Sequence, residues 1–461
     1  MHRHLSRSFA ATGATALLAT ALLTAPGAQS AAATTCQGKT VTIDGTGQPT
    51  VTGTPGNDVI VVSQGSTVTA LAGDDTICVV PGTATPAPTP AAATTIDAGD
   101  GNDSVESGVA GQPNPDKITL GAGDDTLIFH GVQTPAGSAD FGEGNNTLVD
   151  SDGGVVAINA TTKVLDRNGV VALRWQGNVT TYVVESTATS VAFTGTSANE
   201  TFVLRDPATG ATPTTVAVDM AGGDDTITIR SNVLDGSTWN GGDGTDLFQV
   251  AFDYTALLLD LRSGQFETGA ADVTADQRVS NFENVDAVTA TVTVKGSDPA
   301  NVINLQGCTM TAASRAGADT INSGVDIADA PTLTCTGSKM VARGGKDADT
   351  INGTVGGDRL FGNKGEDVIS AEGGDDVIFG GDDADRIQGN GGDDRVRGSK
   401  GDDELAGNFG KDRVQGDQDD DRLLAHAGND VLVGGLGFDR ANGGKGIDKC
   451  SAVERSSKCE R

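Results

Sequence analysis

The chain has 461 residues, of which 65 are glycine and only 4% are aromatic. Several large globular cores would need more aromatic side chains, and the glycines follow no Gly-X-Y period, which excludes collagen. The formal net charge of −31 argues against nucleic acid and anionic membranes as partners, because an acidic surface repels both and attracts cations. Composition therefore predicts an elongated, turn-rich repeat protein.

Residues 1–32 have the pattern of a signal peptide. Arg3 and Arg7 give a basic start, a short apolar run covers Ala14–Leu23, and small residues follow up to Ala33. This run is much shorter than the ~20 residues that a membrane span needs, and no later run could span a membrane. The sequence therefore predicts a secreted, extracellular protein without a membrane span.

Six cysteines are present, and an even number in an exported chain indicates disulfides. A zinc site is disfavoured because the chain has no CxxC pair. Six cysteines allow fifteen connectivities. Proximity in the sequence favours the pairs Cys36–Cys78, Cys308–Cys335 and Cys450–Cys459.

Residues 33–343 contain loose copies of a nine-residue motif, with glycines at its start and Asp at its sixth place. Thr- and Val-rich stretches between the copies alternate as expected for the wall of a β-solenoid. Residues 81–95, rich in Pro, Ala and Thr, are expected to form a loop. A separate β-sandwich within 150–300 is the alternative. The copies begin at Gly53, Ala70, Ala98, Leu120, Met220, Gly241 and Ser314.

Residues 344–451 repeat the motif as twelve consecutive nonads without insertion. The fourth place is Gly in nine nonads and Asp in three, and the eighth is a large aliphatic residue in ten. The sixth place is always aspartate: Asp349, Asp358, Asp367, Asp376, Asp385, Asp394, Asp403, Asp412, Asp421, Asp430, Asp439 and Asp448.

Each place of the nonad has a physical role. Glycines let the backbone turn tightly, and the last three residues alternate as a short strand with its middle residue inward. Turn plus strand, repeated, predicts a parallel β-solenoid with two nonads per coil. Stacked nonads then place their Asp carboxylates ~4.8 Å apart, where two charges repel by ~3.5 kcal/mol at an effective dielectric of 20. Calcium ions between successive turns would reverse this repulsion, because Ca²⁺ prefers carboxylate and carbonyl oxygens.

The pattern is similar to GGxGxDxUx, the RTX (hemolysin-type) calcium-binding repeat. The resemblance implies a parallel β-roll that binds several Ca²⁺ ions through its Gly-rich turns and the twelve sixth-place aspartates. Asp347, Asp383 and Asp419 occupy the Gly place and depart from the pattern, which leaves the carbonyl geometry there open. The ending IDKCSAVERSSKCE resembles the Cys-bearing tail of actinobacterial calcium-binding proteins, so residues 452–461 are expected to form a cap. Aspartates that only make turns, or a disordered acidic segment, are the alternatives.

Catalytic signatures are missing from the sequence. It contains neither HExxH nor GxSxG, so the protease and lipase classes known with such repeats are disfavoured. We therefore expect a calcium-binding structural or interaction protein and no enzyme. The alternative is a carbohydrate-active enzyme or adhesin whose active face lies in 36–343, with cell-surface or polysaccharide ligands. Residues relevant to that alternative are few: His130, His426, Trp175, Trp239, Tyr182 and Tyr254.

Overall fold

The computed structural model describes residues 35–81, 92–185, 187–205, 214–231, 233–251, 256–269, 277–325, 327 and 330–460. The expected signal peptide, most of the loop at 81–95 and Tyr254 lie outside these residues. Regular structure in the described residues consists of β-strands, so the predicted all-β class is confirmed. None of the described residues forms a helix that is long and apolar enough to cross a membrane.

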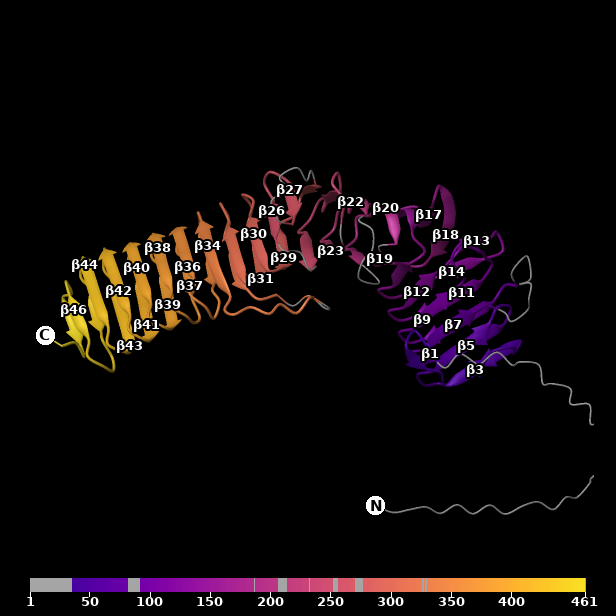
Figure 1. The fold of residues 1–461 in the computed structure, drawn as a ribbon, viewed down its shortest axis with the longest axis horizontal. Helices are drawn as coiled ribbons and strands as arrows, with labels where there is room; N and C mark the ends of the chain where they lie inside the picture. Colours follow the sequence, from indigo (N-terminus) through magenta and orange to yellow (C-terminus); the bar gives the residue numbers. More distant parts are fainter. Residues whose placement is uncertain are drawn as a thin grey trace, which may run out of the picture.

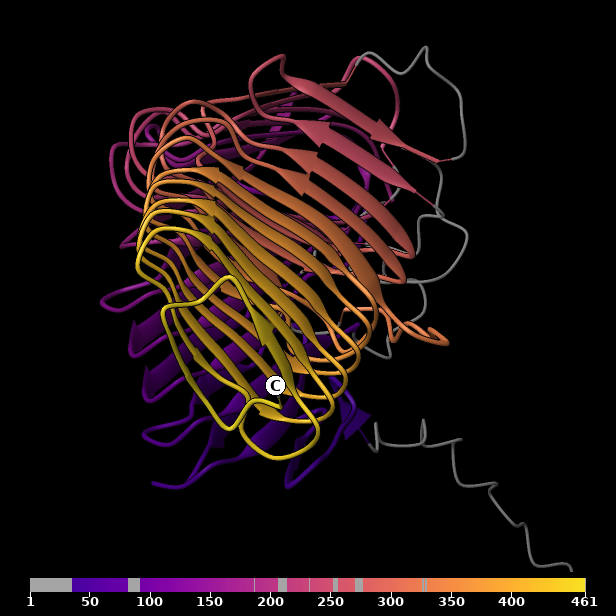
Figure 2. The same ribbon diagram turned by 90° about the vertical axis from the view of Figure 1, so that its left-hand side faces the viewer.

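The strands wind into one elongated, flattened coil (Figure 1), and the view from the C-terminal end shows the coils stacked behind one another (Figure 2). Each coil contributes one strand to each of two facing walls. In the repeat array, β35 (Thr350–Asn352) pairs in parallel with β37 (Val368–Ser370), with Thr350 opposite Val368. The spacing of 18 residues (368 − 350) confirms two nonads per coil.

The first wall is a ladder of parallel strands that runs from one end of the described chain to the other. Its strands are β3 (Ile43–Gly45), β5 (Val59–Ser63), β7 (Thr76–Val80), β9 (Ser104–Ser107), β12 (Thr126–Phe129), β15 (Thr147–Asp150), β19 (Thr181–Glu185), β21 (Thr201–Arg205), β23 (Thr226–Arg230), β25 (Leu247–Ala251), β29 (Asn284–Val288), β31 (Val302–Gln306), β33 (Thr320–Ser323), β35, β37, β39 (Arg386–Gly391), β41 (Glu404–Phe409), β43 (Arg422–Ala427), β45 (Arg440–Asn442) and β47 (Arg455–Ser457).

The second wall faces the first and is also mainly parallel. Its parallel strands are β4 (Thr50–Thr52), β6 (Thr67–Thr69), β8 (Thr95–Asp100), β11 (Lys117–Ala122), β14 (Ser138–Asp140), β20 (Ala188–Thr194), β22 (Thr215–Asp219), β24 (Thr238–Asn240), β30 (Thr291–Lys295), β32 (Thr309–Ala313), β34 (Lys339–Gly345), β36 (Arg359–Lys364), β38 (Val377–Asp382), β40 (Arg395–Lys400), β42 (Arg413–Gln418), β44 (Val431–Leu436) and β46 (Lys449–Ser451).

Two antiparallel meanders are inserted in the second wall, and the sequence did not predict them. The first is β16 (Gly154–Asn159), β17 (Val164–Arg167) and β18 (Val170–Gln176). The second is β26 (Leu257–Asp260), β27 (Gln265–Thr268) and β28 (Gln277–Ser280). Their outer strands pair in parallel with the neighbouring coils, as β18 does with β14 and β16 with β20. The described strands of 150–300 thus belong to the two walls, and they form no separate β-sandwich.

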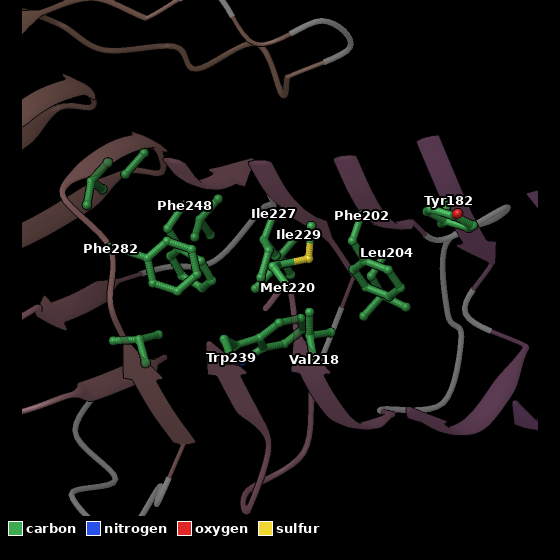
Figure 3. Close-up of a cluster of buried hydrophobic side chains, with 14 of the residues drawn as sticks. Tyr182, Phe202, Leu204, Val218, Met220, Ile227, Ile229, Trp239, Phe248 and Phe282 are labelled. Carbon is green, nitrogen blue, oxygen red and sulfur yellow. The ribbon is translucent and has the colours of Figure 1, made fainter. Parts of the chain in front are cut away.

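The core lies between the walls and changes in thickness along the chain. In the array it is built mainly from the eighth-place aliphatic residues, such as Leu360 and Ile378, both 0% exposed. Nearer the middle of the chain it also holds aromatic rings (Figure 3), such as Phe248 and Phe282 with ring centroids 5.0 Å apart. The more N-terminal coils therefore bury larger apolar side chains than the repeat array does.

Three disulfides join the pairs that sequence proximity favoured. Cys36–Cys78 ties a small hairpin, β1 (Thr35–Cys36) and β2 (Lys39–Thr40), to the first wall. Cys308–Cys335 closes a loop before the array, and Cys450–Cys459 holds the C-terminal tail against β46. A short parallel pair, β10 (Pro113–Asn114) with β13 (Val132–Gln133), lies outside the two walls.

Candidate metal centre

The sixth-place aspartates line the two edges of the array, where each turn leads into a wall strand. We call the turns leading into the first wall the first edge, and those leading into the second wall the second edge. The first edge carries Asp349, Asp367, Asp385, Asp403, Asp421 and Asp439. The second edge carries Asp358, Asp376, Asp394, Asp412, Asp430 and Asp448.

On each edge, one carboxylate oxygen of each aspartate joins its coil to the coil before. The Oδ1 atom of Asp367 accepts a hydrogen bond from the backbone N–H of Asp349 at 2.8 Å, and that of Asp376 accepts one from Asp358 at 2.7 Å. The same bond recurs along both edges of the array, and all twelve aspartates are at most 2% exposed. A hydrogen bond between coils therefore satisfies one oxygen of each carboxylate.

The other carboxylate oxygen has no protein partner in all but one of these aspartates. The Oδ2 atom is buried and without a hydrogen-bond partner in eleven of the twelve aspartates. Asp358 is different, because its Oδ2 accepts the N–H of Thr354 at 2.6 Å. Burying a carboxylate oxygen without a partner is costly. Each edge therefore carries a row of buried oxygens that a cation could bind.

Glycines make room for this row and expose backbone carbonyls beside it. A Cβ atom on Gly362, the first place of its nonad, would lie 2.1 Å from Asp367 Oδ2 and 2.8 Å from the carbonyl oxygen of Gly380. At the fourth place, Gly410 has φ of 135°, and a Cβ there would lie 1.7 Å from the carbonyl oxygen of Gly392. Side chains at these places would fill the space that the carboxylate and carbonyl oxygens line.

The three nonads with Asp at the fourth place keep the same turn. Asp347, Asp383 and Asp419 have φ of 71°, 82° and 72°, in the left-handed region that Asp tolerates better than most residues. Each carboxylate accepts a hydrogen bond from the fourth-place N–H of the coil before, as Asp383 does from Gly365 at 3.2 Å. Their carbonyl oxygens lie 2.1 Å, 2.3 Å and 2.1 Å from where a Cβ on the fourth-place glycine of the next coil would be, close to the 2.0 Å found for the carbonyl of Gly374, so the carbonyl position is retained.

Two further features that join the coils were not predicted from the sequence. Fifth-place side chains form a second, exposed ladder, in which Asp375 Oδ1 accepts the N–H of Asp393 at 2.9 Å. The recurrent DD and ND pairs were the signal for it. In the tail, Glu454 takes the place of the next aspartate, because its Oε2 accepts the N–H of Asp439 at 2.7 Å. The coil therefore continues into the expected cap.

Burial raises the pKa of most sixth-place aspartates, and neighbouring carboxylates add to this at several of them. Burial, with the carboxylates one coil away, raises the pKa of Asp376, Asp385 and Asp421 to about 8, although a backbone hydrogen bond to each works in the opposite direction. No group of three or more His, Cys, Asp or Glu side chains in the described residues could hold a metal ion by itself. The oxygens beside each other at these edges come from carboxylates and backbone carbonyls, a set of ligands that suits Ca²⁺.

These pKa values predict how the calcium-free protein responds to pH. A carboxyl group whose pKa is raised by folding stabilises the fold below its unfolded pKa, and this contribution is lost as pH rises through the folded value. We expect the calcium-free array to be more stable at about pH 5 than at about pH 9. Circular dichroism in the presence of chelator would measure the difference, because a larger fraction of the array should be folded at the lower pH. A calcium-free array that gains stability over this pH range would contradict the prediction.

A solenoid whose edges carry rows of buried, unpartnered carboxylate oxygens beside turn carbonyls is a calcium-binding β-roll. The RTX calcium-binding nonapeptide repeat matches the chain at 343–378, 352–387, 370–405, 379–414, 406–441 and 415–449. Several copies of this repeat are therefore found in the C-terminal region, and the resemblance found in the sequence is confirmed. No curated protein matches the chain.

Proposed function

We propose that this is a secreted, extracellular protein in which Ca²⁺ ions between the coils complete the solenoid, and that it serves a structural or interaction role without catalysis. The observation that carries the proposal is the row of unpartnered Oδ2 atoms along each edge of the array. Ca²⁺ would be held there by the sixth-place carboxylates and the carbonyls of the Gly-rich turns. When bound, the ion supplies positive charge between oxygens that otherwise repel one another.

An extracellular location suits both the disulfides and the cation. Disulfides persist in oxidising compartments, and calcium modules outside cells are tuned to ~10⁻⁴–10⁻³ M. Intact-mass measurement of the secreted protein should give a chain that starts near Ala31–Ala33 and lacks two hydrogens for each of the three disulfides. A mass that corresponds to free thiols throughout would contradict the oxidised state.

A carbohydrate-active site in 36–343 finds less support in the described residues. Trp175, Trp239 and Tyr182 are at most 5% exposed, so their rings pack in the core and offer no surface on which a sugar could stack. The carboxylates of Asp152 and Glu106 accept hydrogen bonds from the His130 ring and raise its pKa to about 9, so this imidazole is protonated at neutral pH and is not poised to act as a base.

The interaction role can be tested with a polysaccharide array, probed with and without Ca²⁺. Calcium-dependent binding without release of product would support an interaction role. Casein and fatty-acid esters should not be hydrolysed. Hydrolysis that disappears when His130 or His426 is changed would replace the proposal with an enzyme.

A further inference from the structure

The first edge continues through the N-terminal half of the solenoid, outside the residues that match the repeat family. The Oδ1 atoms of Asp75, Asp103 and Asp125 accept hydrogen bonds from the backbone N–H groups of Asp58, Asp75 and Asp103, at 2.8 Å, 2.8 Å and 2.9 Å. Asp246 accepts the N–H of Asp225 in the same way, at 2.8 Å. These aspartates are the sixth places of the loose copies found in the sequence, and the paired coils place them in one row.

Unpartnered oxygens also recur along this part of the first edge. The Oδ2 atoms of these aspartates are buried without a hydrogen-bond partner, and the residues are at most 2% exposed. The glycine cradle is present as well, since a Cβ on Gly101 would lie 2.2 Å from the carbonyl oxygen of Gly73. The residues with an unpartnered Oδ2 on this stretch of the edge are Asp75, Asp103, Asp125, Asp225, Asp246 and Asp319.

The coil with Asn146 at its sixth place shows that the backbone carbonyls beside this position can accept hydrogen bonds from a donor there. At Asn146 the amide oxygen accepts the N–H of Asp125 at 2.8 Å, as an aspartate would. Its amide nitrogen then donates to the backbone carbonyls of Phe141, Glu143 and Asn178, at 3.2 Å, 3.4 Å and 2.8 Å. The carbonyls beside this place thus receive donors from Asn146. An aspartate has no such donor to offer, and its own Oδ2 adds negative charge.

The second edge of the same coils is built differently. Its buried acid, Asp116, has both oxygens satisfied, by the N–H of Thr94 at 2.7 Å and the hydroxyl of Ser107 at 2.7 Å. Elsewhere on that edge a hydroxyl takes over the role, as Ser237 Oγ accepts the N–H of Val216 at 3.0 Å. Apart from Asp150, which pairs with Arg167, the aspartates with an unpartnered Oδ2 in the described N-terminal coils therefore lie along the first edge.

We propose that the first edge binds Ca²⁺ in the N-terminal half as well, in short rows between consecutive aspartates. One row lies along Asp75, Asp103 and Asp125, and another lies between Asp225 and Asp246. Asn146 and Glu200 separate them. The proposal rests on the proposed function and extends it to one edge of a region that the repeat family does not match.

The test uses the full-length protein and compares two buried aspartates. Asp103→Asn keeps the hydrogen bond to Asp75, as Asn146 shows, but removes the free carboxylate oxygen. After equilibrium dialysis and elemental analysis it should bind less calcium than the wild type, having lost the ions that Asp103 shares with its neighbours. Asp116→Asn, equally buried but fully hydrogen-bonded, should bind as much calcium as the wild type. Asp225→Asn repeats the test in the second row if Asp103→Asn folds poorly.

Hydrogen exchange then locates the effect. In the wild type, calcium should slow exchange of the turn amides before β7, β9 and β12, and Asp103→Asn should remove this slowing. Wild-type calcium content in Asp103→Asn and Asp225→Asn, or an equal loss in Asp116→Asn, would overturn the proposal. The array provides a separate readout in the same data. Slower exchange with calcium in β36–β45 but not in β7–β12 would refute this inference alone. No slowing by calcium in either region would refute the proposed function.

Discussion

Removal of calcium should unfold residues 344–451 while most strands of residues 36–343 remain. The array carries 24 acidic and 13 basic residues, a net charge of −11 (13 − 24). Most of its buried carboxylates have one oxygen, Oδ2, whose only expected partner is the cation. Repulsion along both edges then adds to a conformational entropy cost that a thin core cannot offset. Hydrogen exchange with and without chelator should show protection lost across β36–β45, and limited proteolysis should cut first between Gly344 and Ser451.

The N-terminal half has other sources of stability. Its rings pack in the core, as Phe193 does on Phe202 at a centroid distance of 5.1 Å, and Cys36–Cys78 and Cys308–Cys335 cross-link its coils. Only its first edge carries the proposed ions, so chelation should loosen the turns there and leave the wall strands paired. Equal loss of protection in both halves would mean that calcium holds them equally. No loss in either half would mean that the aspartates serve only as turn residues.

The regularity of the array made its fold readable from the sequence. Twelve nonads without insertion fix the spacing of 18 residues between stacked strands, so the two-nonad coil followed from the pattern alone. Before Gly344 the spacing varies, and the sixth place changes to Asn146, Glu200, Glu283 or Asn301. A search for aspartate at a fixed interval cannot find these positions, because only the paired walls show that they stand in one row.

The different roles of the two carboxylate oxygens could not be predicted either. Whether Oδ1 of Asp367 reaches the N–H of Asp349 depends on the register of stacked coils, which the structure supplies. The satisfied Oδ2 atoms of Asp58 and Asp358 have a local cause. Each lies four residues after a threonine whose N–H it accepts, Thr54 and Thr354, at 2.6 Å in both cases. The sequence contains these threonines, but their effect becomes clear only once the turn is known.

Asp376→Asn should change the stability of the array in opposite directions with and without calcium. The amide oxygen can still accept the N–H of Asp358, so the coils stay joined. Without calcium the substitution removes a carboxyl whose pKa burial raises to about 8, and the array should become more stable above that pH. With calcium it removes a ligand, so the sites shared with Asp358 and Asp394 should weaken while those on the first edge are less affected.

Asp376→Ala separates the hydrogen bond from the charge. It leaves the buried N–H of Asp358 without its acceptor, which costs about 1–3 kcal/mol whether or not calcium is present. Asp375→Asn is the matched control, because Asp375 is the exposed neighbour in the same turn. It should keep the calcium stoichiometry and affinity of the wild type. The three variants would be compared by calcium titration calorimetry, by thermal unfolding with Ca²⁺, and by the fraction of folded array that circular dichroism shows with chelator. If Asp376→Asn bound calcium with unchanged stoichiometry and affinity, the unpartnered oxygen of this carboxylate would not be a calcium ligand.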